Sequence, residues 1–261
     1  MAVLNTTPDS FYAQSRRENE QAIATAITQF IEQGADIIDV GGYSSRPGAE
    51  HISIEQEKER LKPALEYLAI NFPNFPVSID TFRAEVAYWA IKDYSVGIIN
   101  DISGGQLDSD IIPVAAQLQC PFIGMHMRGT PQTMQENTKY NDIVREIIMY
   151  FAQMIEKCKL AGINDIIVDP GFGFSKTIEQ NYEILNNLQD FLVLDRPILA
   201  GMSRKSMIYK LLDIKPSESL PGTISLHTIA LLKGASIIRV HDVKEAVQML
   251  YVTQKVLNLN P

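Results

Sequence analysis

Short apolar runs alternate with longer amphipathic stretches along the whole chain. The clearest run is Ile166-Ile167-Val168, three β-branched residues in succession, which is typical of a strand buried on both faces of a parallel sheet. It ends at Asp169, and the sequence Pro-Gly-Phe-Gly over 170–173 then predicts a tight turn that is not helical. The same order of apolar run, polar loop and amphipathic stretch recurs, so the pattern predicts repeated strand–loop–helix units.

Eight such units can be placed along the sequence. Strands are predicted at 1–4, 37–40, 77–79, 96–99, 122–125, 166–168, 197–200 and 236–240. Helices are predicted at 18–33, 53–70, 82–92, 110–118, 141–160, 179–188, 222–233 and 243–256. Parallel strands need crossover connections, and eight of them in 261 residues favour an α/β fold of the (β/α)8 TIM-barrel type, a single domain over residues 1–261.

Two qualifications accompany this fold prediction. A doubly wound open sheet is the alternative, but no predicted strand is followed by the G-x-G-x-x-G of its dinucleotide-binding form. The first apolar run begins abruptly at Met1, so we expect N-terminal residues to be missing from this sequence.

Composition narrows the class of protein. The chain is 46% hydrophobic and 21% charged, which is ordinary for a globular protein. Its net charge of −8 disfavours nucleic-acid or anionic-membrane binding, and no apolar run approaches the roughly 18 residues of a membrane span. Two cysteines, Cys120 and Cys158, are too few for a disulfide framework, so we expect a reducing, cytoplasmic compartment.

Polar residues follow the carboxyl end of each predicted strand. In a barrel these ends share one face, where active sites lie. Any one of them is explained equally well as a capped strand end or a solvated loop, but eight together favour a functional site. The residues are Asn5, Asp39, Asp80, Asn100, Asp101, His126, Asp169, Ser203, Arg204, Lys205, Arg239 and His241.

These residues divide into two chemical groups. Asp80, Asn100 and Asp169 suit the hydrogen-bonding edge of a flat aminopyrimidinone-like ring. A second group of cations follows the last two strands, where this fold often binds phosphate, and an Arg-x-His pair suits a diphosphate. That group consists of Lys205, Arg239 and His241.

Alternatives remain for the cations. Arg239 and His241 are also explained by an ion pair with the neighbouring Asp242, and Arg204 by a surface position in the first turn of a helix. The four histidines have no metal-ligand spacing, and His51 is expected to be structural. Mg²⁺ held by diphosphate oxygens and one amide oxygen remains compatible with the sequence.

Eight segments resemble, in order and over nearly the whole chain, the motifs of dihydropteroate synthases. They are 5–11 (NTTPDSF), 39–49 (DVGGYSSRPGA), 78–81 (SIDT), 99–105 (INDISGG), 125–131 (MHMRGTP), 169–174 (DPGFGF), 201–206 (GMSRKS) and 239–243 (RVHDV). The resemblance implies a TIM barrel that joins 6-hydroxymethyl-7,8-dihydropterin diphosphate to p-aminobenzoate. The products would be 7,8-dihydropteroate and diphosphate, within folate biosynthesis.

The resemblance also implies roles for individual residues. Asp169 and Lys205 would act in catalysis, with Asp9 and Arg46 completing the site over the diphosphate, and Asn5 would ligate Mg²⁺. The family is commonly a homodimer, and the closing helices are the expected interface. The pterin would be bound by Asp80, Asn100, Met125, Asp169 and Lys205, and the diphosphate by Arg239 and His241. The p-aminobenzoate pocket, which sulfonamides occupy in this family, would be formed by Ser45, Arg46, Pro47, Phe174, Lys205 and Ser206.

One motif departs from the family. Where the family usually has Glu-Ser-Thr-Arg-Pro, this chain has Tyr43-Ser44-Ser45-Arg46-Pro47. The change bears on loop packing and sulfonamide sensitivity more than on activity.

Two other functions are compatible with a pterin-binding barrel. A methyltetrahydrofolate-binding methyltransferase has no need of the cations at Lys205 and Arg239. A pterin-binding paralogue without activity is expected to lose part of the anion site or the loop at Asn5, and both are intact here.

Overall fold

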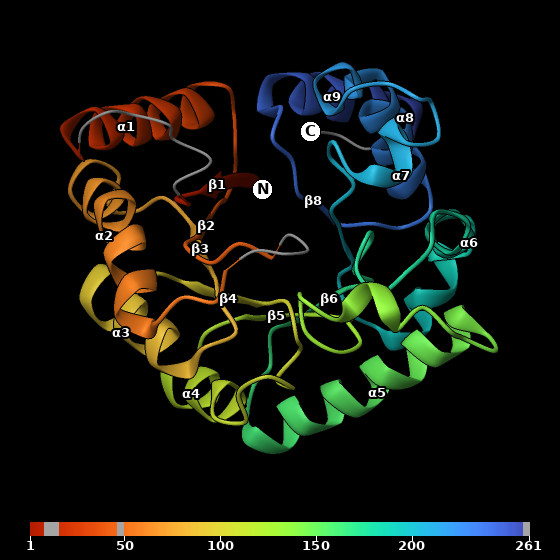
Figure 1. The fold of residues 1–261 in the computed structure, drawn as a ribbon, viewed down its shortest axis with the longest axis horizontal. Coiled ribbons are helices and arrows are strands. Elements are labelled where there is room, and N and C mark those ends of the chain that lie inside the picture. The colour runs from red at the N-terminus through yellow and green to blue at the C-terminus, as the bar shows by residue number, and fades with distance from the viewer. Residues whose placement is uncertain (8–15, 46–49, 258–261) are drawn as a thin grey trace.

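Parallel strands form a closed ring in the computed structural model, which describes residues 1–7, 16–45 and 50–257 (Figure 1). Within these residues the strands are β1 (Ala2–Asn5), β2 (Ile38–Gly41), β3 (Val77–Asp80), β4 (Ile98–Asp101), β5 (Phe122–Met125), β6 (Ile166–Asp169), β7 (Leu199–Ala200) and β8 (Ile237–Ile238). Each strand from β1 to β5 pairs with the next, and β7 pairs with β8.

Single bridges close the two remaining gaps of the ring. Val168 pairs with Ile198 between β6 and β7, and Ala2 pairs with Val240 between β1 and the end of β8. The amide of Val3 donates to the carbonyl of Val240 at 2.9 Å, and the amide of Val240 donates to the carbonyl of Met1 at 2.9 Å. The fold is therefore the predicted (β/α)8 barrel and not an open sheet.

Helices form the outer layer around this ring (Figure 1). In the described residues they are α1 (Arg16–Glu32), α2 (Ile54–Asn71), α3 (Ala84–Tyr94), α4 (Ile111–Leu118), α5 (Ile143–Ala161), α6 (Ile178–Asn186), α7 (Ser206–Tyr209), α8 (Leu220–Leu232) and α9 (Val243–Val256). Short 3₁₀ helices lie at Met134–Glu136, Leu188–Leu194 and Pro216–Glu218. The eight long helices were predicted, with ends that differ by at most two residues.

Local sequence signals explain where the helices begin and end. Ser53 and Gln56 form the predicted capping box at the start of α2, each side chain bonding the backbone amide of the other. Gly162 ends α5 at φ 97°, a conformation that costs glycine nothing. None of the helices among the described residues is long and apolar enough to cross a membrane.

The barrel interior is filled by layers of four side chains from alternate strands, as in other TIM barrels. The lowest layer of the even-numbered strands is entirely isoleucine and packs against Met1, Ile123 and Leu199. Residues two positions further along a strand point to the same face. The isoleucine layer consists of Ile37, Ile98, Ile167 and Ile237. The next layer of the same strands, two positions further on, consists of Asp39, Asn100, Asp169 and Arg239. The apolar core therefore gives way to a polar layer at the carboxyl end of the barrel.

Candidate functional site

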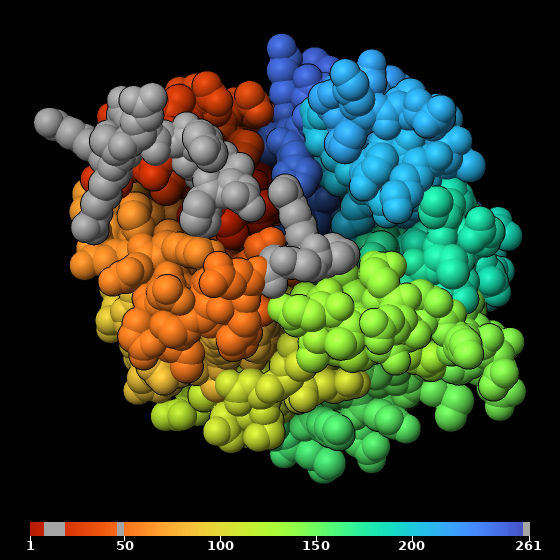
Figure 2. All heavy atoms as spheres, viewed as in Figure 1, coloured from red at the N-terminus to blue at the C-terminus, as the bar shows by residue number. Residues whose placement is uncertain are grey.

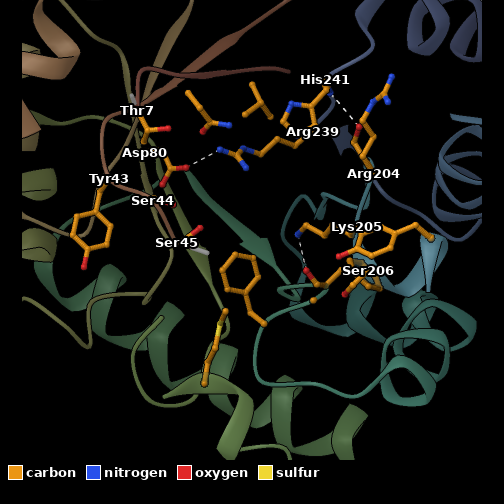
Figure 3. Close-up of a pocket in the computed structure, with 18 residues that line it drawn as sticks. Thr7, Tyr43, Ser44, Ser45, Asp80, Arg204, Lys205, Ser206, Arg239 and His241 are labelled. Atoms are coloured by element: carbon orange, nitrogen blue, oxygen red, sulfur yellow. Dashed lines mark hydrogen bonds and ion pairs between the residues drawn. The ribbon is translucent and has the colours of Figure 1, made fainter. Parts of the chain in front are cut away.

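A cavity of about 300 Å³ opens above this polar layer. Its lining comes from the ends of strands across the barrel, including Asn5 at the end of β1, Asp80 at the end of β3 and Arg239 after β8. The face seen in Figure 2 is hollowed near its middle, where segments from both halves of the chain meet. In Figure 3, Ser44 and Ser45 lie on one side of the cavity and Lys205 and Ser206 on the other. The site is where a TIM barrel carries its chemistry.

Arg239 is the centre of a buried polar cluster on the cavity floor. Its Nε donates to Oδ2 of Asp39 at 2.6 Å, and its Nη2 donates to Oδ2 of Asp80 at 2.7 Å (Figure 3). Asn100 Nδ2 donates to the same Asp39 oxygen at 2.9 Å. Asp39 is fully buried, so these contacts fix the orientations of both the guanidinium and the amide.

The alternative partners expected from the sequence are wrong. Asp242 pairs with Arg204 and not with Arg239: Arg204 Nε lies 2.9 Å from Oδ2 and Nη2 lies 2.6 Å from Oδ1 of Asp242. Arg204 also donates through Nη1 to the carbonyl of Ser217 at 3.1 Å. Arg204 is thus held in a bidentate pair that ties the loop after β7 to the start of α9, and is not a free surface cation.

Burial shifts the pKa values of the carboxyl groups at the cavity floor. It raises the pKa of Asp80 to about 7, with the neighbouring Asp39 adding to the effect and Arg239 opposing it. Burial also raises the pKa of Asp169, while Lys205 and the Gly171 amide oppose the shift. The cavity therefore disfavours unpaired negative charge.

The basic groups respond to the same burial. It lowers the pKa of Lys205 to about 8, against the pull of Asp169. Burial opposes the charge of Arg239, but the carboxylates of Asp39 and Asp80 raise its pKa above the ordinary value. Desolvation and the adjacent Arg239 lower the pKa of His241 to about 4, although the residue keeps exposed surface. An anionic group of a ligand in this cavity would therefore meet the cations of Lys205 and Arg239 and the imidazole of His241.

The turn after β6 carries the opposite wall of the cavity. Oδ1 of Asp169 accepts from the amide of Gly171 at 2.8 Å, and Lys205 Nζ donates to the carbonyl of Phe172 at 2.6 Å. The Lys205 ammonium lies 4.9 Å from the centre of the Phe174 ring. Gly171 has φ +72°, and a Cβ there would collide with the carbonyl oxygen of His126. The predicted tight turn is thus confirmed, with a glycine that no other residue replaces without strain.

The predicted site residues fall into three groups. Asn100, Met125 and Asp169 are buried beside the cavity floor and do not line it. Asp9, Arg46 and Pro47 lie outside the described residues. Those that line the cavity are Asn5, Ser45, Asp80, Phe174, Lys205, Ser206, Arg239 and His241.

Two strand-end residues serve the loops and not the cavity. Oδ1 of Asp101 accepts from both the amide and the hydroxyl of Ser103 at 2.8 Å. His126 is buried, and its Nδ1 lies 3.0 Å from Nζ of Lys176. For these two, the simpler reading of strand-end residues that shape a loop is confirmed.

Sequence reasoning missed several residues of the site. Asp39 was recognised only as a strand-end residue, although it orients Arg239 and Asn100. Met134 and Tyr209 also line the cavity, and both belong to helices of three or four residues that give no periodic signal. That Met134 and Tyr209 belong to the site follows only from the three-dimensional shape of the cavity.

No group of three or more histidine, cysteine or acidic side chains that could hold a metal lies within the described part of the chain. Asn5 offers one amide oxygen at the cavity wall. Mg²⁺ is commonly bound through one or two protein ligands together with substrate phosphates, so this donor set fits a metal that arrives with a diphosphate and not a resident one.

Comparison with known proteins decides the family. The family model described as pterin binding enzyme matches residues 1–241. The dihydropteroate synthase of Escherichia coli strain K12 is 42% identical over 260 residues, covering 99% of this chain and 91% of the relative. The chain belongs to the dihydropteroate synthase family.

Solved structures of dihydropteroate synthases share the same fold. The Clostridium difficile enzyme, crystallised in the presence of pteroic acid, gives a TM-score of 0.92 at 36% identity, covering 98% of this chain and 95% of that one. The Yersinia pestis enzyme, in a complex with a sulfonamide drug, gives 0.90 at 37% identity, covering 99% and 94%. The barrel described above is thus the fold of solved dihydropteroate synthases.

Proposed function

We propose that this dihydropteroate synthase joins 6-hydroxymethyl-7,8-dihydropterin diphosphate to p-aminobenzoate, releasing diphosphate and 7,8-dihydropteroate. The observation that carries the proposal is the arrangement of the cavity. Lys205, Arg239 and His241 line the same 300 Å³ space as Asp80, with the buried Asn100 and Asp169 at its floor. One site therefore offers hydrogen bonds for a flat ring and positive charge for an anionic leaving group.

The pterin would lie against the polar layer. Because Asn100 already donates its Nδ2 to Asp39, its Oδ1 is left to accept a hydrogen bond from the ring. Asp80 and Asp169 would accept from ring N–H groups, and each has a raised pKa that a donor from the ligand would lower again. Met125, which pairs in register with Asp169 and belongs to a buried apolar cluster, would pack against the ring.

Diphosphate departure is the step in which the cations would act. The bond between the pterin methylene carbon and the diphosphate oxygen breaks, and its electron pair leaves with diphosphate. Lys205 and Arg239 would neutralise that charge, and His241 would donate a hydrogen bond. The buried carboxyl group of Asp169, when ionised, would stabilise the cation left on the pterin, which is why we assign Asp169 and Lys205 to catalysis.

The amine then completes the transfer. The nitrogen of p-aminobenzoate forms a bond with the methylene carbon and loses a proton to water. An arylamine is nucleophilic at neutral pH, so we assign no strong general base, and positioning is the main requirement. Ser45, Phe174 and Ser206 would surround this ring, and sulfonamides would compete for the same place. By family resemblance, Asp9, Arg46 and Pro47 would add to the site.

Mg²⁺ is proposed as the metal of this reaction. Asn5 would hold it together with the diphosphate oxygens, and the ion would neutralise further charge on the leaving group.

We also propose a homodimer formed through α8 and α9. These helices border an apolar groove of about 490 Å³ that includes Leu220, Ile224 and Met249. Leu232, Val252 and Val256 are 51%, 67% and 70% exposed along it. Contiguous exposed apolar surface of this kind is typical of an interface between subunits. Val252→Glu should convert a dimer to a monomer in light scattering, and an unchanged mass for wild type and variant would contradict this interface.

A cytoplasmic location and a single functional domain over residues 1–261 complete the proposal. Cys120 and Cys158 are both free and buried, which suits a reducing compartment. The first and last strands pair with each other, which suits one folding unit.

Product analysis tests the proposed function. The purified protein is incubated with both substrates and Mg²⁺, and 7,8-dihydropteroate is identified by mass. Omission of either substrate, chelation of Mg²⁺ and addition of a sulfonamide should each remove or reduce the product. Formation of no dihydropteroate by a folded protein would overturn the proposal, and methyl transfer from methyltetrahydrofolate would favour the methyltransferase alternative.

A further inference from the structure

Tyr43 stands where the family usually has a glutamate, and its side chain is held by contacts with four residues of the neighbouring loops. Its hydroxyl lies 3.1 Å from Nδ1 of His51 and accepts from Nε2 of Gln132 at 3.1 Å. Its ring packs edge-on against Phe82 with centroids 5.1 Å apart, and the guanidinium of Arg83 lies 5.3 Å from the ring centre. The His51 ring also lies edge-on to that of Tyr43, with centroids 5.9 Å apart, so a single side chain makes two hydrogen bonds and three ring contacts.

These contacts join three loops at the mouth of the barrel. Tyr43 follows β2, Phe82 and Arg83 follow β3, and Gln132 lies in the loop after β5. His51 precedes α2 and extends the contact to the far end of the connection that begins at Tyr43. Tyr43 is thus the point at which the β2, β3 and β5 loops meet.

The partner beneath Tyr43 is itself fixed. Arg83 Nη1 donates to Oε2 of the fully buried Glu57 at 2.7 Å, and its Nη2 donates to the carbonyl of Ile52 at 2.5 Å. The hydroxyl of Thr81 donates to the other Glu57 oxygen at 2.7 Å. These hydrogen bonds hold the guanidinium of Arg83 in place beneath the ring of Tyr43.

The residues that follow Tyr43 enter the cavity. Ser44 and Ser45 both line it, on the side opposite Lys205 and Ser206 (Figure 3). The groups assigned to the pterin come instead from strand ends, where Asp39 and Arg239 hold them. A change at Tyr43 would therefore move one wall of the cavity and leave the floor in place.

We propose that Tyr43 is a positioning residue that sets the affinity for the amine substrate by fixing Ser44 and Ser45, while leaving the affinity for the pterin substrate unchanged. The inference rests on the proposed function. Tyr43 itself lines the cavity beside these two serines. In this account its hydroxyl, which is engaged by His51 and Gln132, acts through the serines and not on either substrate. The chain thus replaces an acidic side chain of the family with a hydrogen-bonded aromatic anchor.

Three variants test this role. Tyr43→Phe keeps the ring and removes the hydroxyl, and Tyr43→Ala removes both. Tyr67→Phe is the matched control, because it deletes a hydroxyl that bonds Thr28 on α1, away from the cavity. The loss of neutral hydrogen bonds predicts a rise in KM for p-aminobenzoate of about 3- to 10-fold for Tyr43→Phe, and a larger rise for Tyr43→Ala. KM for the pterin diphosphate should stay within about 2-fold in both, and Tyr67→Phe should change neither KM.

A direct measurement of p-aminobenzoate binding tests the role of Tyr43 independently of turnover. p-Aminobenzoate is titrated calorimetrically into each protein saturated with the pterin alcohol and inorganic diphosphate, and the same weakening is expected for the Tyr43 variants. Equal changes in both KM values, or no change in either KM or in the titration, would overturn the role of Tyr43. If wild type forms no dihydropteroate, the proposed function fails, and the titration alone then decides whether Tyr43 controls amine binding.

Discussion

Arg239 Nη2 and Asp80 Oδ2 lie 2.7 Å apart although the two residues are separated by 159 positions in the sequence. The sequence placed Asp80 with the pterin and Arg239 with the diphosphate. Their contact means that the two halves of the substrate would be recognised by one connected cluster, with Asp39 on its other side. Occupation of one half should therefore change the other.

Asp80→Asn tests this connection. The substitution keeps the size of the side chain but removes a charged acceptor, and hydrogen bonds to charged groups contribute about 1.5–3 kcal/mol. We expect the Kd of the pterin alcohol to rise at least 10-fold, and the affinity for inorganic diphosphate to increase because Arg239 loses one counter-charge. Calorimetry with each ligand alone measures both effects. Unchanged Kd values for both ligands would contradict the cluster.

Lys205 predicts a pH dependence. Its pKa is lowered to about 8, so the free enzyme loses this positive charge as pH rises through about 8. Because kcat/KM reports the ionisation of the free enzyme, kcat/KM for the pterin diphosphate should fall on the alkaline side with an apparent pKa near 8. Lys205→Arg, whose guanidinium stays protonated, should lower kcat/KM but remove this alkaline limb up to about pH 10. An identical limb in the variant would assign the titration to another group.

The buried pair of Glu57 and Arg83 predicts a large effect on stability. The Glu57 side chain is 0% exposed and that of Arg83 is 9% exposed. Arg83→Met would leave Glu57 buried without its cation, so we expect the free energy of unfolding in urea to fall by about 3–5 kcal/mol. The double variant Glu57→Gln/Arg83→Met should recover part of this loss, because it removes the unpaired charge. A double variant no more stable than Arg83→Met would show that the charge is not the cause.

Gly171 in the turn after β6 and Gly162 at the end of α5 both have positive φ, so Gly162 serves as a matched control for a substitution at Gly171. A Cβ at Gly171 would meet the backbone of His126, whereas at Gly162, with φ +97°, it would meet nothing within 4 Å. Gly162→Ala should cost about 1 kcal/mol of stability through backbone strain and leave both KM values unchanged. Gly171→Ala should cost more and raise KM for the pterin diphosphate, because it displaces the turn that holds Asp169. Equal effects of the two substitutions on KM would contradict this function of the turn.

Much of the barrel could be predicted because its signals are local. β-Branched runs give the buried strands, and the capping box at Ser53 and the glycine at 162 give helix ends. Strand β4 was placed two residues early because Asn100 and Asp101 are poor strand formers, yet pairing with β3 and β5 holds them in the sheet. The four-residue helix α7 is too short for a periodic pattern.

The site was harder to predict because its partners are distant in sequence. Motif resemblance indicated many of the residues that line the cavity. No local pattern shows that Arg239 pairs with Asp39 and Asp80 and leaves Asp242 to Arg204. The lowered pKa of His241 depends on desolvation and on the charge of Arg239, and neither is visible in the sequence. The partners of Arg239 and the pKa of His241 therefore follow only from contacts in the folded structure.

Release of diphosphate from the pterin diphosphate, measured with and without p-aminobenzoate, tests the proposed transfer most directly. With Mg²⁺ and both substrates, we expect one diphosphate for each 7,8-dihydropteroate formed, sustained over many turnovers. Without the amine, release should stop or become slow hydrolysis, and chelation of Mg²⁺ should suppress release in both cases. A folded protein that binds the pterin diphosphate but releases no diphosphate in the presence of p-aminobenzoate would contradict the account and favour a pterin-binding role without catalysis.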